Sequence, residues 1–298
     1  MVDGLVIVDK PSGWTSHDVV ARMRRIAGTR RVGHAGTLDP MATGVLVCGI
    51  GKATKILGRV SGSTKAYEAT IRLGMATTTD DAEGEVVSVT DARALAADPA
   101  VLDEQVAALT GSIMQRPSAV SAIKVDGKRA YQRVRAGENV TLTARPVTIE
   151  RFDVDAVTVS ETDDGTCLVD LVARIECSTG TYVRALARDL GDALGVGGHL
   201  TALRRTRVAG FSLDQASTLA DLERELVVTP LGQACAELYT NVVVEDADAA
   251  RISHGGRIGW PTELASDDTV AVYGPERRIL ALAECKDNKL APTVVWAN

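Results

Sequence analysis

A dense run of chemically capable residues extends from Arg31 to Leu46. It places His34 and Asp39 among closely spaced glycines. A carboxylate such as that of Asp39 can act as a nucleophile, or as the ionic partner of a cationic intermediate, without help from a metal. Asp39-Pro40 is also typical of a helix N-cap followed by proline at the first helical position, and a lone histidine is more often structural. This run alone therefore does not decide whether Asp39 and His34 have a chemical role or a purely structural one.

A second segment, Gly49-Ile50-Gly51-Lys52-Ala53-Thr54, superficially resembles a phosphate-binding loop. The pattern fails, because Leu46 stands where the loop requires its first glycine, and Ala53 follows the lysine in place of Ser or Thr. The five cysteines, at 48, 167, 177, 235 and 285, form no Cys-x-x-Cys pair and have no histidine grouping nearby. We therefore expect no nucleotide cofactor, no metal site and no disulfide framework.

Basic residues gather in three places, although the formal net charge is −6. Five arginines and no acid lie between Asp18 and Asp39. The segment from Lys124 to Arg151 contains seven basic and three acidic residues. A third group, Arg204, Arg205 and Arg207, follows Arg184 and Arg188. Charge runs are usually solvated faces, but three of them in an acidic protein favour local contacts with phosphate groups.

The composition, and the lack of a recognisable export signal or membrane span, predict a folded protein of the cytoplasm. Apolar residues make up 45% of the 298 residues and charged residues 24%, which is ordinary for a globular chain. The N-terminus carries acid where an export signal needs basic charge, and no apolar run approaches the ~20 residues that cross a bilayer. We therefore expect a cytoplasmic location and no membrane partner.

Several segments form one ordered set of motifs. The central one is Gly33-His34-x-Gly36-x-Leu38-Asp39-Pro40-x-Ala42-x-Gly44-Val45-Leu46. The others are Leu5-Val6-Ile7-Val8-Asp9-Lys10-Pro11-x-Gly13-x-Thr15-Ser16, Lys65-x-Tyr67-x-Ala69, Thr77-x-Thr79-x-Asp81-x-x-Gly84, Ser121-Ala122-Ile123-Lys124, Gly180-Thr181-Tyr182-Val183-Arg184 and Leu203-Arg204-Arg205-Thr206. Together, and in this order, they resemble the TruB family of pseudouridine synthases over about residues 4–212. The chain departs from the family at Gln115-Arg116-Pro117-Ser118-Ala119-Val120, where relatives often carry a second proline and an aromatic residue.

The resemblance implies a role for individual residues. Asp39 matches the catalytic aspartate and Arg184 the arginine that pairs with it. The substrate-binding set comprises Tyr67, which would stack on a flipped uracil, Tyr182 at the edge of that base, Leu203 beneath it, His34 in the gap left in the RNA, and Lys55 and Asp81 in support. The insertion at about 120–151 would contact the RNA backbone through Lys124, Lys128, Arg129, Arg133 and Arg135.

The implied function is isomerisation of uridine to pseudouridine in the T loop of tRNA, at position 55, with no cofactor. The partner would be the T arm of tRNA, and a monomer is expected. Two alternatives stay open. One is the same chemistry directed by a guide RNA, and the other is a non-catalytic chaperone that helps tRNA to fold.

The elements that must position these residues read as an α+β fold. We expect a mixed, largely antiparallel sheet with flanking helices, because strands at 4–9, 65–73 and 168–177 alternate with helices at 16–28 and 98–111. Ser16 is the expected N-cap of the first helix. Short apolar pieces separated by turns after Pro230 predict a small all-β module that resembles a PUA domain. We place a catalytic domain at 1–236 and the PUA-like module at 237–298.

Overall fold

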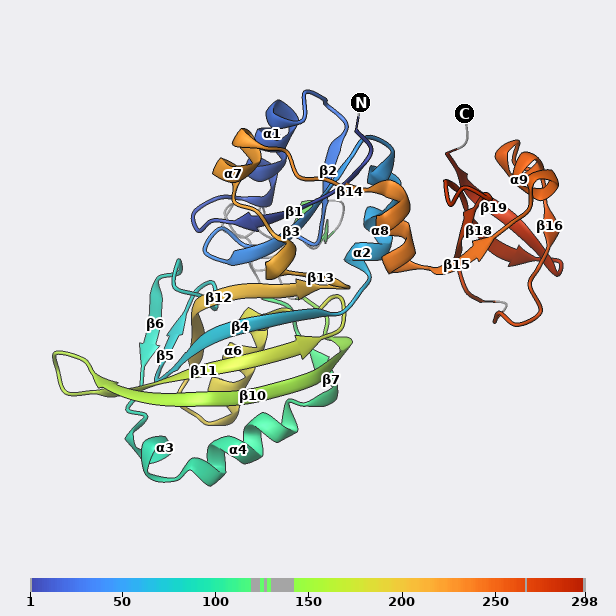
Figure 1. Ribbon diagram of the computed structural model, residues 1–298. Coiled ribbons are helices and arrows are strands. Elements are labelled where there is room, and N and C mark those ends of the chain that lie inside the picture. Colours follow the sequence, from blue (N-terminus) through green and yellow to red (C-terminus); the bar gives the residue numbers. More distant parts are fainter. Residues whose placement is uncertain (1, 119–123, 126–127, 130–141, 266, 297–298) are drawn as a thin grey trace.

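The computed structural model describes residues 2–118, 124–125, 128–129, 142–265 and 267–296. Within them, a 10-stranded sheet with flanking helices forms the larger part, and a five-stranded sheet forms the C-terminal part (Figure 1). The larger sheet runs in the order β14 (Thr229–Pro230), β1 (Gly4–Lys10), β3 (Thr43–Ile50), β12 (Gly198–Val208), β4 (Lys65–Leu73), β11 (Cys167–Cys177), β10 (Arg145–Glu161) and β7 (Gly111–Gln115). β2 (Val32–Ala35) pairs with β3, and β13 (Phe211–Ser212) pairs with β12.

A short parallel seam joins the two halves of this sheet. Strands β3 and β12 pair in parallel at Thr43 with Arg204 and at Gly44 with Arg205, whereas the other pairings within the sheet are antiparallel. This arrangement confirms the expected mixed, largely antiparallel α+β fold. It also brings the chain that follows Asp39 beside the middle of β12.

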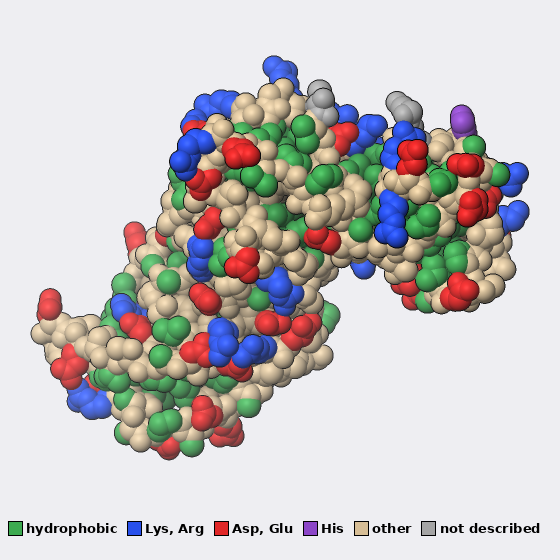
Figure 2. Space-filling model, viewed as in Figure 1, with side chains coloured by type: hydrophobic (Ala, Val, Ile, Leu, Met, Phe, Trp, Pro, Cys, Tyr) green, Lys and Arg blue, Asp and Glu red, His purple; other side chains and the backbone are tan. Residues whose placement is uncertain are grey.

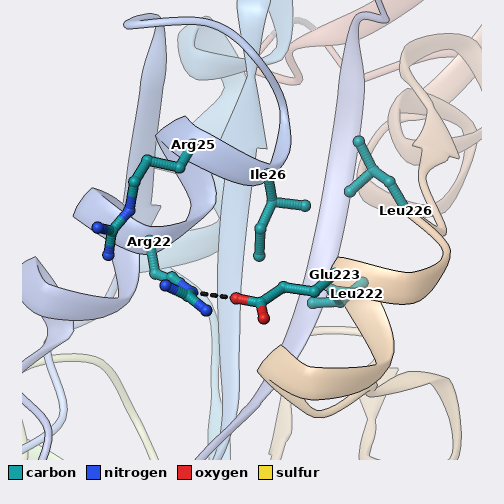
Figure 3. A pocket seen from close by; sticks show the side chains of 6 residues that line it. All are labelled: Arg22, Arg25, Ile26, Leu222, Glu223 and Leu226. Carbon is teal, nitrogen blue, oxygen red and sulfur yellow. Dashed lines mark ion pairs between the residues drawn. The ribbon is translucent and has the colours of Figure 1, made fainter.

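Helices and smaller hairpins surround the sheet (Figure 1). The helical elements are α1 (Ser16–Ile26), η1 (Gly51–Ile56), α2 (Leu57–Ser61), α3 (Arg93–Ala97), α4 (Pro99–Ala108), α6 (Val183–Ala193), η2 (Leu213–Gln215), α7 (Leu219–Arg224) and α8 (Leu231–Leu238). The hairpins are β5 (Met75–Thr77) with β6 (Val86–Val89), and β8 (Lys124–Val125) with β9 (Lys128–Arg129). Helices α1 and α7 are joined by the Arg22–Glu223 ion pair, beside a pocket that Ile26 and Leu222 also line (Figure 3).

The first helix, α1, agrees with the sequence prediction in its buried face but not in its N-cap. Val19 and Met23 are buried and Arg25 is exposed, as the apolar stripe predicts. The N-cap prediction was wrong by one residue, because Thr15 caps the helix through a reciprocal pair of bonds with Asp18. Ser16 is buried instead, and its hydroxyl bonds the backbone of a distant loop. Burial of this hydroxyl is a tertiary effect that capping statistics do not contain.

Two other sequence predictions hold closely. Strand β4 buries Tyr67, Ala69, Ile71 and Leu73 on one face, as the alternation indicates. Helix α4 begins after Asp98, whose side chain accepts from the backbone N–H of Ala100, but it ends at residue 108 rather than 111.

The outer face of the larger sheet is crossed by ion pairs between strands. Arg72 pairs with Asp170, Arg174 with Asp155 and Arg207 with Glu176. Acidic and basic side chains also intermingle over the face of the molecule seen in Figure 2. Arg204 pairs in the same way with Asp9. Two arginines of the third basic cluster, Arg204 and Arg207, thus pair with carboxylates of the same sheet, and the contact of this cluster with phosphate stays a prediction.

The C-terminal part is β-rich, as predicted. Its sheet runs in the order β15 (Thr240–Val243), β17 (Val270–Tyr273), β18 (Ile279–Lys286), β19 (Lys289–Val295) and β16 (Ile258–Gly259). One short helix, α9 (Asp246–Ser253), lies beside it and was not predicted. Helix α8 runs through the expected boundary at 236/237, and the phenol of Tyr273 donates to the carbonyl of Gly232 on that helix.

None of the helices within the described ranges is long and apolar enough to cross a membrane.

Candidate active site

A cleft of about 310 Å³ opens where four segments of the larger part meet. The loop 36–39 before β3 and the loop 179–184 at the start of α6 form two of its walls. Lys65 and Tyr67 of β4 and Leu203 and Arg205 of β12 form much of the remainder. Asp39, Tyr67, Tyr182, Arg184 and Leu203, which lie far apart in the sequence, thus line one cavity.

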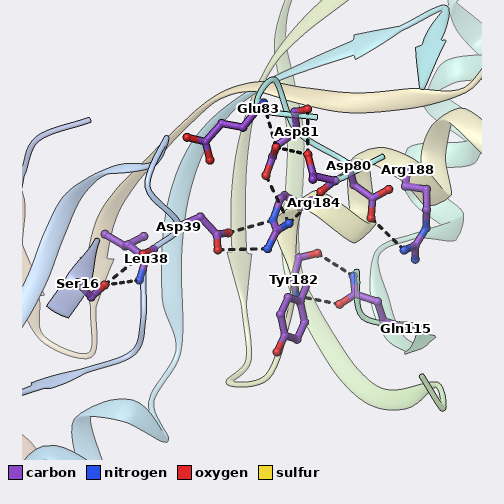
Figure 4. Close-up of polar contacts among 11 residues, drawn as sticks. Ser16, Leu38, Asp39, Asp80, Asp81, Glu83, Gln115, Tyr182, Arg184 and Arg188 are labelled. Carbon is purple, nitrogen blue, oxygen red and sulfur yellow. Dashed lines mark hydrogen bonds and ion pairs between the residues drawn. The ribbon is translucent and has the colours of Figure 1, made fainter. Parts of the chain in front are cut away.

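Asp39 and Arg184 form a bidentate ion pair in this cleft (Figure 4). The guanidinium Nε of Arg184 donates to Asp39 Oδ2 at 3.0 Å, and Nη2 donates to Oδ1 at 3.2 Å. The arginine side chain is only 4% exposed, whereas that of Asp39 is 36% exposed. The bidentate pair therefore holds the partly exposed carboxylate of Asp39 in a fixed orientation at the mouth of the cleft.

A second carboxylate holds the other side of Arg184. The Nη1 atom of Arg184 lies 3.4 Å from Asp81 Oδ2 and donates to the carbonyl of Thr79 at 2.8 Å. The carboxylate of Asp81 accepts in turn from the hydroxyl of Thr79 and from the backbone N–H of Glu83. A cation at the N-terminal end of a helix opposes the helix dipole, so the two carboxylates supply the compensation that Arg184 needs in α6.

The loop that carries Asp39 is not a helix start. Residues 36–42 form an irregular turn that leads into β3, so the local interpretation of Asp39 as an N-cap was wrong. The buried hydroxyl of Ser16 accepts from the N–H of Leu38 at 2.9 Å and donates to its carbonyl at 3.1 Å (Figure 4). The N–H of Gly13 donates to the carbonyl of Pro40 on the other side of Asp39. The loop is thus fixed on both sides of Asp39 by the segment between β1 and α1.

Lys10 adds a third anchor for this loop. Its ammonium group donates to the carbonyls of Pro11, Trp14 and Pro40, at 2.9, 2.7 and 3.1 Å. Burial lowers the pKa of Lys10 to about 8, and the nearby carboxylate of Asp39 opposes that shift. The lysine therefore ties the start of α1 to the residue that follows Asp39.

Close approach of two backbones requires glycine beside the site. Gly44 has φ +96, and a Cβ there would lie 2.2 Å from the carbonyl oxygen of Arg205. The Arg205 side chain is 1% exposed and donates to the carbonyls of Val45 and Gly36. The parallel seam and the turn before it are consequently held by one buried guanidinium.

Tyr67 and Leu203 form the apolar floor of the cleft, both nearly buried at 8% and 7% exposure. Burial raises the pKa of the Tyr67 phenol, so the ring is a neutral surface. Lys65 lies beside it and donates to the carbonyls of Ser61 and Ser63, and burial lowers the pKa of its amino group to about 8. Such a floor suits the flat face of a planar ring.

Three predicted substrate-binding residues lie outside the lining of the cleft. Asp81 is buried behind it, where it holds Arg184. His34 is half-buried on β2, where its ring meets that of His17 edge-on at 5.6 Å between centroids. Lys55 is exposed on η1. Of the predicted backbone-contacting residues, Lys124, Lys128 and Arg129 belong to the β8–β9 hairpin, and Arg133 and Arg135 lie outside the described residues.

Four residues that build the site were not predicted from the sequence, namely Lys10, Lys65, Gln115 and Arg205. Lys10, Lys65 and Arg205 stand inside the motifs of the sequence, and Gln115 opens the segment that departs from the family pattern. Lys65 bonds carbonyls close to it in sequence, whereas the other three residues have distant backbone partners that only the folded chain brings near. Within the described residues, no three His, Cys, Asp or Glu side chains gather in a way that could hold a metal ion.

Comparison with known proteins assigns the family. Residues 24–183 match the model of the TruB family pseudouridylate synthase N-terminal domain. Residues 184–245 match the tRNA pseudouridylate synthase B C-terminal domain, and residues 240–295 match the pseudouridine synthase II TruB C-terminal domain. The chain belongs to the TruB family of pseudouridine synthases. It is 55% identical to tRNA pseudouridine synthase B of Arthrobacter sp. (strain FB24) over 100% of this chain and 97% of that protein.

A second tRNA pseudouridine synthase B and two solved structures are also similar to this chain over nearly all of its length. The tRNA pseudouridine synthase B of Thermobifida fusca is 54% identical, with 100% of this chain and 99% of the relative covered. A solved Cbf5-Nop10-Gar1 complex contains a chain that is 26% identical with a TM-score of 0.70, over 98% of this chain and 84% of that one. A chain of a solved H/ACA RNP bound to a substrate RNA is 24% identical with a TM-score of 0.70. It shares the fold over 99% of this chain and 85% of that chain.

Proposed function

We propose that this TruB family protein isomerises uridine to pseudouridine in tRNA, at position 55 of the T loop. The observation that carries the proposal is the Asp39 carboxylate, held by Arg184 at the open side of a cleft with an apolar floor. The names of the relatives support tRNA as the substrate.

The reaction needs one carboxylate and no redox partner. The N1–C1′ bond of the uridine breaks, the uracil turns while it stays bound, and C5 joins C1′. A proton leaves C5 and another is gained at N1, so the product is an isomer of the substrate. Asp39 acts as the nucleophile or as the ionic partner of the sugar cation, and the guanidinium of Arg184 orients its carboxylate.

The target uridine must leave its stack before the sugar can reach Asp39. Tyr67 then stacks on the flipped uracil, Leu203 supports it and Tyr182 lies at its edge, where its hydroxyl can move the proton of C5. Stacking of a base on an aromatic ring is worth about 1–3 kcal/mol, which helps to offset unstacking in the RNA. His34 fills the gap in the RNA, and Lys55 contacts the RNA outside the cleft.

Binding of the T arm uses further parts of the chain. The segment at about 120–151 contacts the phosphates through Lys124, Lys128, Arg129, Arg133 and Arg135, and the loop is recognised mainly by shape. The catalytic domain spans 1–236 and the PUA-like module 237–298. The protein acts as a monomer in the cytoplasm.

The test combines a bare tRNA transcript with a matched pair of variants. Asp39→Asn should lower the single-turnover rate of pseudouridine formation by at least about a thousandfold while tRNA affinity stays within a few-fold, because an amide cannot replace the carboxylate. The control is Asp9→Asn, which removes a carboxylate from an equally bidentate pair, with Arg204, outside the cleft. It should retain the parent rate.

Two results would contradict the proposal. Turnover by Asp39→Asn within about tenfold of the parent would remove Asp39 from the chemistry. Binding of tRNA by the parent with no pseudouridine formed would favour a guide-directed enzyme or a folding chaperone.

A further inference from the structure

Gln115 makes a reciprocal pair of hydrogen bonds with the backbone of Tyr182. Its Nε2 donates to the carbonyl of Tyr182 at 3.1 Å, and its Oε1 accepts from the N–H of Tyr182 at 2.8 Å (Figure 4). The glutamine lies at the end of β7 and is 1% exposed. The side-chain amide of Gln115 thus bonds the Tyr182 backbone as a neighbouring strand would, although the two residues are 67 positions apart in the sequence.

The residue that Gln115 holds is the one from which α6 begins. Tyr182 is the N-cap of this helix, with extended backbone angles, and its own side chain makes no capping bond. Its carbonyl also accepts the first helical bond, from Leu186 at 3.2 Å. Since the cap lacks the side-chain acceptor that usually fixes it, Gln115 supplies the constraint from outside the helix.

This constraint determines the position of two residues in the cleft. One is Tyr182 itself, which lines the cavity. The other is Arg184, two residues further on, whose guanidinium is held by Asp39, Asp81 and the carbonyl of Thr79. Arg184 is thus fixed at its charged end by carboxylates and at its backbone end by Gln115.

A second tie joins the same short stretch of chain to α6. Arg188 lies one helical turn after Arg184, and its Nη2 donates to the carbonyl of Arg116 at 2.6 Å. The same guanidinium pairs with Asp80, beside Asp81, at 3.2 Å, and with Asp189 at 2.7 Å. The end of β7 is therefore attached to the first two turns of α6 at two points.

We propose that Gln115 is a positioning residue of the reaction, and that it sets the Tyr182 ring and the Arg184–Asp39 pair for catalysis. The proposal rests on the proposed function. Gln115 lies outside the cleft and touches no reacting group, so it acts through Tyr182. Loss of its two bonds should therefore slow the chemical step more than it weakens the binding of RNA.

Two variants separate this role from simple packing. Gln115→Leu keeps most of the volume but neither bond, and its single-turnover rate at saturating tRNA should fall by about 10- to 100-fold with the tRNA Kd within about threefold. Gln115→Glu keeps the acceptor for the Tyr182 N–H but, when ionised, has no donor for its carbonyl. Burial raises the pKa of such a carboxyl, so its rate relative to the parent should rise as the pH is lowered from about 8 to about 6.

The control is Val147→Ala, a cavity variant in β10, the strand that pairs with β7. It should lower thermal stability and leave the single-turnover rate close to that of the parent. Hydrogen exchange supplies a readout without activity, since the Tyr182 amide should exchange faster in Gln115→Leu and remain protected in Val147→Ala.

Three results would overturn the proposal. They are a parent-like rate in Gln115→Leu, an equal rate loss in Val147→Ala, or a Tyr182 amide that stays protected in Gln115→Leu. A parent that makes no pseudouridine would contradict the proposed function instead, and the exchange experiment would still decide whether Gln115 fixes the start of α6.

Discussion

Arg184 is the residue on which most of the polar contacts of the site converge. It is buried between Asp39, which is partly open to solvent, and Asp81, whose side chain is 4% exposed. The two carboxylates thus have different environments around one cation. Such an arrangement leaves Asp39 open to solvent while Asp81 compensates the buried charge of Arg184.

We predict that Arg184→Met destabilises the fold by about 3 kcal/mol, because it leaves the Asp81 carboxylate buried without its cation. Adding Asp81→Asn should recover part of that loss, since the uncompensated charge is removed. Urea unfolding of the parent, both single variants and the double variant gives the coupling energy. Strictly additive effects would show that Asp81 does not depend on Arg184.

Lys10 provides a prediction of pH dependence. Burial lowers its pKa from 10.5 to about 8 in the folded state, so the folded protein binds fewer protons than the unfolded chain between those values. Stability then rises with pH through this window, and the contribution of Lys10 is least favourable below about pH 8. The difference in unfolding free energy between the parent and Lys10→Met should shift by about 2 kcal/mol in favour of the parent from pH 7 to 10. A flat difference across that range would contradict the lowered pKa.

At the level of elements, the end of β1, the start of α1 and the turn between them hold the loop 36–42. They do so through the buried ammonium of Lys10, the buried hydroxyl of Ser16 and a backbone bond from Gly13. These contacts, and the pairing of β3 with β12 directly after the loop, fix an irregular turn that has no secondary structure of its own.

We predict that Ser16→Ala lowers stability by about 1–3 kcal/mol, because the buried N–H and carbonyl of Leu38 lose their partner. Ser12→Ala is the matched control, since Ser12 also bonds this loop, at the carbonyl of Met41, but is exposed. Its effect should stay within about 0.5 kcal/mol. Chemical denaturation measures both, and equal effects would show that burial of the hydroxyl is unimportant.

At the scale of the whole molecule, the two parts share one apolar cluster. Leu5 of β1, Val47 of β3 and Phe211 of β13 pack in the same cluster as Tyr273 and Trp296 from the C-terminal part. The amino group of Lys52 also donates to the carbonyl of Trp296. Because the two parts share this core, we expect them to unfold as one cooperative unit.

We predict a single unfolding transition for the full chain, with the same midpoint for tryptophan fluorescence and for exposure of the Cys48 thiol. Cys48 is buried in the larger part, and burial raises the pKa of its thiol to about 12, so it reacts only after unfolding. Trp296→Ala should lower the free energy of unfolding by about 3–5 kcal/mol in both signals. Two separate midpoints in the parent would show that the parts unfold independently.

Local patterns determined the parts of this protein whose partners are close in sequence. The alternation of β4 and the apolar stripe of α1 follow from a period of two or 3.6 residues, and the structure confirms them. The order of the motifs identified the TruB family and brought Asp39, Tyr67, Tyr182 and Arg184 to attention. Those four residues do line one cleft.

Tertiary structure decided what the local patterns could not contain. Asp39 has the sequence of a helix cap but lies in a turn, because Ser16 and Lys10 hold the neighbouring carbonyls. Arg205 and Gln115 have partners up to 169 and 67 residues away. A polar side chain is buried only where its hydrogen bonds can be satisfied, and the groups that satisfy these residues come together only once the sheet has closed around the cleft.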